Sequence, residues 1–348
     1  YSKVGGYGNH DTKVLVPTKA KTTGSHASSL MKTLKAGHHN VQLPQDEWRA
    51  LAAWIDCNAP YYGDHKEIIT VKDLAAITQP PSKSINTLQR SFAVADLRRN
   101  EALIIRNGKI LWSYPVKSAT EMKTYPDGAY LISGQKEVVM VDRAKHTRFK
   151  FTGNGLFSTE RLPNGNFLVN DNSSNSLIEL NSSGQEITRT STTIKNSKVN
   201  KHHHALHIQH LPNGDRWVAH RDNNFARKYS STGKILRTIN MPCSVTSVQE
   251  LPNGHVLIAG GKPARLSEFD QNGKEIWALT ANDVPDANLM TICGFQRLPN
   301  GNTILTNWTG HGFKGKYLPI IEVNQDKKLV WSFSDTTLIP EPVSIQIL

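Results

Sequence analysis

Residues 247–258 read Ser-Val-Gln-Glu-Leu-Pro-Asn-Gly-His-Val-Leu-Ile, two short runs with apolar side chains joined by a Leu-Pro-Asn-Gly turn. Because the glycine of such a turn supplies the positive φ that a tight hairpin needs, the stretch predicts two paired strands. The turn occurs five times, every 37 to 49 residues, once in the form Tyr-Pro-Asp-Gly. Its copies begin at Tyr125, Leu162, Leu211, Leu251 and Leu298. This period is typical of a β-propeller with one four-stranded blade per repeat.

A second turn follows the first within each repeat. In three copies its glycine (Gly184, Gly233 or Gly273) lies 19 residues after the glycine of the first turn. Several of these turns, and similar segments elsewhere, are followed by a short apolar run that ends in tryptophan, at Trp112, Trp277 and Trp331. We expect these runs to be outer strands, with each tryptophan covering a contact between neighbouring blades.

The two ends of the repeat region complement each other. Arg106–Trp112 has the form of a second turn, yet no Leu-Pro-Asn-Gly turn precedes it. Val343–Leu348 resembles the strand that leads into a first turn. We therefore expect the last strand to pair with strands near 92–114 in one shared blade, which leaves no unpaired sheet edge. The predicted fold is all-β, a six-bladed propeller over residues 92–348.

The first 66 residues have a different pattern. One helix is predicted from Ser25 to Lys35, and a second from Pro44 to Cys57. Apolar side chains at helical spacing should form the buried face of the second helix, namely Trp48, Leu51, Ala52 and Ile55. Residues 67–91, which contain two adjacent prolines, are predicted to be a linker.

Composition describes a globular chain with a basic surface. Its 348 residues are 38% hydrophobic and carry a net charge of +12, without a run of 18 apolar residues that could span a membrane. The lysines and arginines are dispersed through turns and loops, so a nucleic-acid partner is disfavoured. A cationic surface fits an anionic small molecule or glycan, or an acidic protein partner.

Cysteine usage and the first residue leave questions open. Cys243 and Cys293 stand before consecutive repeats, so they are either a disulfide pair or two small buried residues, the reading we favour. Because the first residue is Tyr1, we expect a processed, trimmed or incomplete chain.

Three segments of the N-terminal region, Gly24–Leu30, Ala36–Val41 and Trp54–Gly63, resemble the end of a haem-containing domain. That domain is found in planctomycete envelope proteins and is related to the middle domain of the hydrazine synthase alpha subunit. The resemblance implies a periplasmic or secreted subunit of a haem-containing redox assembly. A c-type haem needs Cys-x-x-Cys-His, which is absent here, so haem is expected only if that motif lies upstream of Tyr1. The axial-ligand candidates are Met31, His38 and His39.

The repeats also resemble quinoprotein-like and arylsulfotransferase-like propellers through the recurring Leu-Pro-Asn-Gly pattern. This resemblance implies the architecture and little about the chemistry. In such a repeat, the loop into the inner strand and the loop between strands two and three open on one face. Both sets of loops should therefore ring the mouth of the central channel.

Several basic and aromatic side chains fall in these loops. The catalytic candidates are His204, His220, Arg221 and His311. The ligand-binding candidates are Trp308, Lys262, Arg265 and Asn223. A metal site remains undecided, because His203 and His207 feed a strand on which they would lie about 13 Å apart, too far for one ion.

Two functions follow from this set. The favoured one is a ligand- or partner-binding module. The alternative is an enzyme, a lyase or a sulfate-transfer or hydrolysis enzyme, acting on an anionic glycan or sulfate ester through the histidines and arginine.

Overall fold

The computed structural model describes residues 28–37, 43–56, 90–194, 205–311, 313 and 315–348. The chain divides into two compact units, Tyr1–Leu74 and Ala75–Leu348. The first contains α1 (Ser29–Lys35) and α2 (Gln45–Asp56). Ser28 caps α1, since its side chain accepts a hydrogen bond from the Met31 backbone N–H (3.4 Å). The described residues of this segment thus contain both helices that the sequence predicts.

One buried side chain on each helix marks its inward face. Met31 of α1 and Ile55 of α2 are buried, while Trp48 and Leu51 are half-buried. Met31 therefore fills the apolar position that the helical spacing gives it. The other two haem-ligand candidates, His38 and His39, lie outside the described residues.

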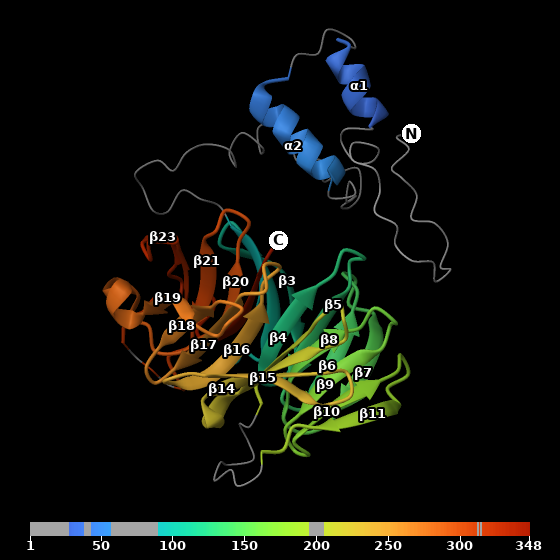
Figure 1. Cartoon of the computed structure of the whole chain (residues 1–348), viewed down its shortest axis with the longest axis vertical. Helices are drawn as coiled ribbons and strands as arrows, with labels where there is room; N and C mark the ends of the chain where they lie inside the picture. Colours follow the sequence, from blue (N-terminus) through green and yellow to red (C-terminus); the bar gives the residue numbers. More distant parts are fainter. Residues whose placement is uncertain (1–27, 38–42, 57–89, 195–204, 312, 314) are drawn as a thin grey trace. The chain divides into compact units, whose positions relative to one another are not determined.

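The second unit consists of six four-stranded antiparallel sheets arranged as a propeller (Figure 1). Blade 1 is β24 (Pro342–Ile347), β1 (Ser91–Asp96), β2 (Glu101–Arg106) and β3 (Lys109–Pro115). Blade 2 is β4 (Ala119–Thr124), β5 (Tyr130–Gly134), β6 (Glu137–Val141) and β7 (Thr147–Thr152). Blade 3 is β8 (Leu156–Arg161), β9 (Phe167–Asp171), β10 (Ser176–Leu180) and β11 (Glu186–Ser191).

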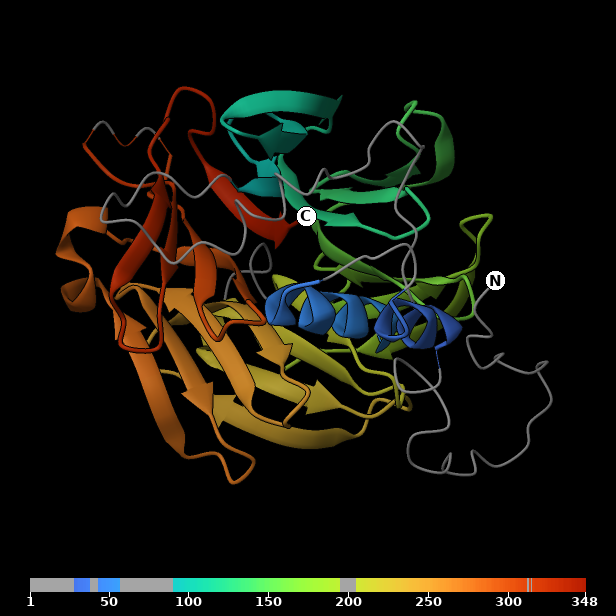
Figure 2. The ribbon, with the colours of Figure 1, turned by 90° about the horizontal axis from the view of Figure 1, so that it is seen from above.

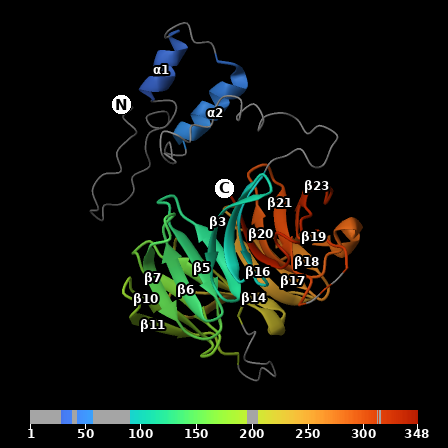
Figure 3. The ribbon, with the colours of Figure 1, turned by 180° about the vertical axis from the view of Figure 1, so that it is seen from behind.

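The remaining blades repeat the same order from the innermost to the outermost strand (Figure 3). Blade 4 is β12 (His207–His210), β13 (Arg216–His220), β14 (Phe225–Tyr229) and β15 (Ile235–Asn240). Blade 5 is β16 (Ser244–Glu250), β17 (Val256–Gly261), β18 (Arg265–Phe269) and β19 (Glu275–Thr280). Blade 6 is β20 (Ile292–Arg297), β21 (Thr303–Asn307), β22 (Ile320–Val323) and β23 (Leu329–Phe333).

The ring closes as the sequence predicts. Strand β24 pairs antiparallel with β1, with Ile345 opposite Val94, so the last strand becomes the innermost strand of blade 1. Seen from above, the blades follow one another in colour order until the red C-terminal strands meet the teal ones (Figure 2). Both predictions, six blades and a shared blade, are confirmed.

The turn glycines have the backbone that the hairpins require. Gly254 has a φ of 79°, and its N–H donates to the carbonyl of Leu251 (2.8 Å) between the first two strands of blade 5. Gly273, with a φ of 86°, makes the corresponding turn between its last two strands. A side chain at either position would be strained, because L-residues rarely adopt this region.

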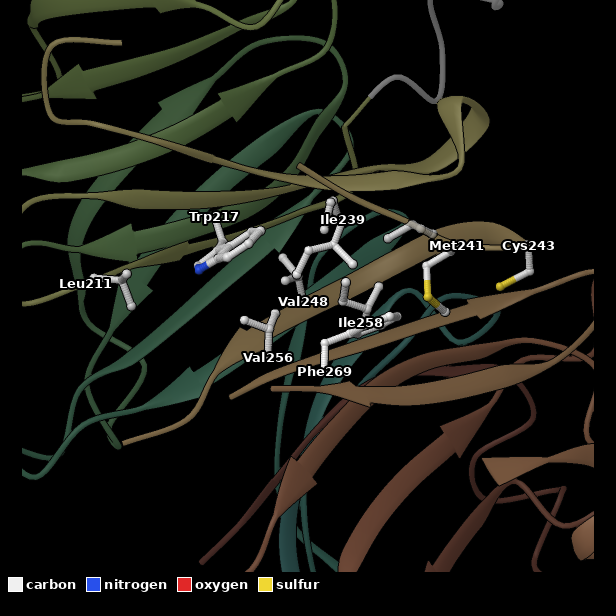
Figure 4. Close-up of a cluster of buried hydrophobic side chains, with 12 residues drawn as sticks. Leu211, Trp217, Ile239, Met241, Cys243, Val248, Val256, Ile258 and Phe269 are labelled. Carbon is white, nitrogen blue, oxygen red and sulfur yellow. The ribbon is translucent and has the colours of Figure 1, made fainter. Parts of the chain in front are cut away.

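The hydrophobic core is divided among the six interfaces between neighbouring blades. Each of six buried clusters draws side chains from two adjacent sheets. Between blades 4 and 5, the fully buried Trp217 and Val248 belong to one cluster with Phe269 (Figure 4). Burying apolar surface between sheets is what holds successive blades together.

The outer tryptophans also join blades. Trp112 of β3 donates its indole N–H to the carbonyl of Arg143 in blade 2 (2.9 Å). Trp277 of β19 does the same to Gln325 in blade 6 (2.8 Å). The buried Trp331 of β23 packs edge-on against Phe92 of blade 1, with ring centroids 6.2 Å apart. The role predicted for these tryptophans is therefore confirmed.

Candidate functional site

The central channel is a cavity of about 490 Å³, lined by the innermost strand of every blade. Loops that connect the second and third strands contribute at one end, which we call the upper end. Its loop residues are Leu97, Gln135, Arg221, Trp308 and His311. The lower end is the end near the Leu-Pro-Asn-Gly turns. The predicted convergence of these loops on the channel mouth is thus seen for Arg221, Trp308 and His311.

Two tiers of positions on the inner strands border this channel. The first tier stands four residues before the Tyr or Leu that begins each first turn, or before Leu348, which follows β24. It comprises Glu121, Ser158, His207, Ser247, Gly294 and Ser344, all of which line the cavity except Ser158. The second tier stands two residues before the same position. It comprises Lys123, Glu160, Gln209, Gln249, Gln296 and Gln346.

First-tier side chains accept hydrogen bonds from the inner strand of the next blade. The Thr159 N–H donates to Glu121 Oε2 (3.0 Å), and the Ile208 N–H donates to Ser158 Oγ (3.2 Å). Ser344 Oγ receives the N–H of Met122 in the same way (3.1 Å). Because inner strands of neighbouring blades form no sheet together, these side chains satisfy backbone groups that would otherwise lack a partner.

Glutamine side chains of the second tier, which stand two residues closer to the lower end, also bond to the inner strand of the next blade. Gln346 accepts from the N–H of Thr124 (2.7 Å) and donates to its carbonyl (3.3 Å). Gln209 makes the same pair of bonds to Glu250, at 2.7 Å and 3.2 Å. These amides therefore serve the ring, since the oxygen and one N–H of each are already engaged with a neighbouring strand.

A charged cluster replaces the glutamines on blades 2 and 3. Lys123 Nζ lies 3.0 Å from Glu121 Oε1 and 3.2 Å from Glu160 Oε1, and it donates to the carbonyl of Thr159 (2.9 Å). Desolvation opposes the charge on Lys123, yet the two carboxylates raise its pKa above the ordinary value. Desolvation raises the pKa of Glu160, against the attraction of Lys123. All three donors of the ammonium group are engaged, so this cluster is a closed structural network.

His207 is held as a neutral ring beside the same cluster. The Val248 N–H donates to its Nδ1 (3.4 Å), and its Nε2 lies 3.5 Å from Glu121 Oε1. The neutral tautomer that fits carries its proton on Nε2. Burial lowers the pKa of His207 to about 4, although Glu121 opposes the shift. His207 thus presents no free lone pair to the channel.

This neutral histidine predicts an acid-sensitive fold. Below about pH 6.5 the unfolded chain protonates His207 while the folded chain does not, so stability should fall by up to about 3 kcal/mol toward pH 4. His207→Gln removes this contribution. Urea unfolding at about pH 7 and about pH 4.5 should show a smaller loss for the variant than for the wild type. Equal losses in both proteins would contradict a low pKa for His207.

Arg221 is the cation at the upper end. It follows β13 in the short 3₁₀ helix Arg221–Asn223, and its Nε lies 3.9 Å from Asp222 Oδ1, beyond hydrogen-bond distance. Burial raises the pKa of Cys293 in β20 to about 12, and the charge of Arg221 opposes that rise. Since the one ion pair seen for Arg221 in the described residues is this long contact with Asp222, its charge is only weakly neutralised.

Trp308 and His311 stand on blade 6 around a buried carboxylate. Glu341 Oε2 lies 3.2 Å from His311 Nδ1 and accepts a hydrogen bond from Trp308 Nε1 (3.3 Å). The two rings meet edge to face, with centroids 5.5 Å apart. The Trp308 backbone N–H donates to Thr291, just before β20, which fixes this loop beside the inner strand (2.8 Å).

His220, another predicted catalytic residue, is not part of the channel lining. His220 is fully buried inside blade 4, with its Nε2 3.0 Å from Tyr229 Oη and its ring tilted against Phe225. This placement leaves His220 no surface on which a ligand could act, so its predicted catalytic role is not supported by the geometry. His204, with His203, lies outside the described residues.

Three predicted ligand-binding residues also lie away from the channel lining. Arg265 on β18 forms a two-pronged ion pair with Glu275 on the neighbouring β19 (2.7 and 2.8 Å). Lys262 is exposed in the turn before β18, and Asn223 is half-buried at the end of the 3₁₀ helix. Of this set, only Trp308 lines the channel.

Several residues of the site were not predicted: Glu121, Lys123 and Glu160 in the channel lining, and the buried Glu341 beside His311. The first three carry a signal that comparison of the repeats reveals, since they stand at fixed distances before the first turn. Glu341 carries no such signal, because it precedes β24 by a single residue and lies 30 positions after its partner His311.

The two propeller cysteines, Cys243 and Cys293, are free thiols. Cys243 is buried, as the favoured interpretation predicts, whereas Cys293 is half-buried. Among the described residues, no three His, Cys, Asp or Glu side chains gather in a way that could hold a metal ion. No helix in the described ranges is long and apolar enough to cross a membrane.

Comparisons with known proteins support the fold. No family model matches the chain, and no curated protein matches it. A protein of unknown function from Bacteroides caccae is 21% identical with a TM-score of 0.64, over 75% of this chain and 99% of that one.

Two solved lyase structures are similar at lower identity. A streptogramin B lyase is 12% identical with a TM-score of 0.52, over 76% of this chain and 88% of that one. A catalytically inactive virginiamycin B lyase from Staphylococcus aureus with quinupristin is 10% identical with a TM-score of 0.52, over 74% and 92%. Likenesses at these identities show a shared propeller fold and nothing about the reaction.

Proposed function

We propose that the propeller is a ligand-binding module that holds a small acidic carbohydrate at the upper end of its channel. The observation that carries this proposal is Arg221, a channel-lining guanidinium whose charge, in the described part of the chain, is met only by Asp222 at 3.9 Å. A cation that is partly withdrawn from water and weakly paired is a ready site for an anion.

The two ends of the channel differ in what they can offer a ligand. At the lower end, Lys123 is saturated by two carboxylates and a carbonyl, and Gln209 and Gln346 are bonded to neighbouring strands. At the upper end, Arg221 and His311 both line the cavity. The ligand site therefore belongs at the upper end.

The ligand class follows from the side chains gathered there. A guanidinium binds a carboxylate or sulfate through two parallel hydrogen bonds. Trp308 supplies an aromatic wall of the kind that covers the apolar face of a sugar ring. A cavity of about 490 Å³ lies within the range of small-molecule sites. The net charge of +12 would also attract an anionic ligand.

Arg221→Met should weaken binding of trigalacturonate about 10- to 100-fold, because a charge-assisted hydrogen bond contributes about 1.5–3 kcal/mol. The measurement is isothermal titration calorimetry at low ionic strength. Arg265→Met is the matched control, since Arg265 is already paired with Glu275 on the outer strands. Its affinity should equal that of the wild type.

Other outcomes would point elsewhere. Equal affinity in the wild type and Arg221→Met would remove Arg221 from the site. No binding of trigalacturonate, together with saturable binding of a poly-glutamate peptide, would favour an acidic protein partner. A loss confined to Arg265→Met would move the site to the outer strands of blade 5.

Two further proposals rest on the sequence resemblance of residues 1–66 alone. These are a place in a haem-containing redox assembly and a periplasmic or secreted location. An absorption spectrum of the native protein tests the first, because bound haem gives a Soret band.

A further inference from the structure

The carboxylate of Glu341 fixes the orientation of the His311 ring. The Glu341 side chain is 4% exposed, whereas that of His311 is 77% exposed and lines the channel. The Glu341 backbone is held as well, because its N–H donates to Asp96 Oδ2 (2.8 Å) and its carbonyl accepts from Leu97 (3.0 Å). A buried, anchored carboxylate beside an exposed imidazole is the arrangement that orients a general base.

The Glu341 carboxylate, which lies 3.2 Å from His311 Nδ1, also favours one tautomer. A carboxylate only accepts, so the His311 nitrogen that faces Glu341, Nδ1, carries the proton of the neutral ring. Its Nε2 is then left with a lone pair. His207, the other described histidine in the channel lining, has the opposite arrangement, with its Nδ1 occupied by the Val248 N–H. Of these two rings, His311 is the one that can accept a proton from a ligand.

We propose that His311 is the general base of a uronate lyase, with Glu341 as its positioning residue and Arg221 as the carboxylate anchor. This inference rests on the proposed function, because it requires the acidic sugar to bind at the upper end. Arg221 and His311 come from blades 4 and 6 and line the same cavity. A guanidinium on the sugar carboxylate stabilises the charge that develops when the neighbouring C–H bond is broken.

The step balances without a co-reactant. His311 Nε2 takes the proton from C5 of the uronate, and the electron pair left on C5 is stabilised by the carboxylate on Arg221. That pair forms the double bond between C4 and C5 as the bond from C4 to the bridging oxygen breaks. The proton on Nε2 then passes to the departing oxygen. The products are an unsaturated uronate and a shortened oligosaccharide, and no external oxidant or reductant is needed.

The test uses the full chain with trigalacturonate, an alginate trisaccharide and a hyaluronan tetrasaccharide as probes. The wild type should release unsaturated uronate from at least one of them, measured by its ultraviolet absorbance. His311→Ala should lower kcat about 10²- to 10⁴-fold with little change in KM. Added imidazole should restore part of this loss, because the vacated position is open to solvent. A purely structural role would not give such rescue.

A matched histidine provides the control. His146 lies 3.2 Å from Asp142 and is 79% exposed, much like His311 beside Glu341, but it stands in the turn between β6 and β7. His146→Ala should keep the full kcat. Glu341→Gln should lower kcat more than it changes KM, since the carboxylate acts through the imidazole.

Two results would overturn the inference and separate it from the binding proposal. If calorimetry shows Arg221-dependent binding but no probe yields unsaturated product, the lyase inference fails and the binding module stands. If none of the three probes binds or reacts, both fail. Turnover by His311→Ala at the wild-type rate would also remove His311 from the reaction.

Discussion

Deletion of residues 342–348 is expected to abolish the folded propeller. These residues form β24, the innermost strand of blade 1, whose loss would leave β1 with an unpaired edge facing the channel. The deletion also removes the bonds from Ser344 to Met122 and from Gln346 to Thr124, which tie blade 1 to blade 2. Because each blade is held by its two neighbours, an opened ring loses stability at both interfaces.

The measurement is thermal unfolding followed by circular dichroism. The truncated chain should show no cooperative transition, whereas the full chain should show one. Deletion of Leu348 alone is the control, because this residue lies beyond β24 and is 52% exposed. It should change the midpoint only slightly. A truncated chain that melts like the full one would show that the shared blade is not needed for closure.

Lys123→Met should destabilise the propeller by about 3–5 kcal/mol at neutral pH, the cost of removing one partner from a buried ionic group. Methionine keeps the length of the side chain but leaves Glu121 and Glu160 facing each other without a cation. The raised pKa of Glu160 means that it takes up a proton at a higher pH than an ordinary glutamate does. The difference between variant and wild type should therefore shrink in acid.

The measurement is urea unfolding at about pH 7 and about pH 5. Lys150→Met is the matched control, because Lys150 pairs with Glu137 on the neighbouring strand (2.8 Å) but its side chain is 54% exposed. An exposed pair of this kind contributes at most about 1 kcal/mol. Equal effects of the two substitutions would show that the channel cluster is not a stabilising network.

The fold could be predicted because the turns repeat. Glycines such as Gly254 and Gly273 are needed for a positive φ, so they mark many of the hairpins directly in the sequence. Strand alternation then fixes which residues are buried. The shared blade could be predicted because no first turn precedes Arg106 and an unpaired strand stands at the other end of the repeats. A closed ring requires that these two ends pair.

The site was only partly predictable, because neighbouring residues on a strand point in opposite directions, so a single position decides whether a side chain lines the channel or is buried in the blade. His220 and Arg221 are neighbours, yet His220 points into blade 4 and Arg221 lines the channel. If the end of the strand is expected one residue too early or too late, the buried position and the channel-lining position are exchanged. Glu341 could not be predicted as the partner of His311, because the ring closure alone brings β24 and its preceding residue beside blade 6.

A crystal structure of the protein with trigalacturonate tests the central claim most directly. The account predicts one sugar carboxylate on the guanidinium of Arg221, a sugar ring against Trp308, and C5 of that sugar facing His311 Nε2. A ligand bound at the lower end beside Lys123, on the outer strands beside Arg265, or absent from the channel at saturating concentration would contradict it.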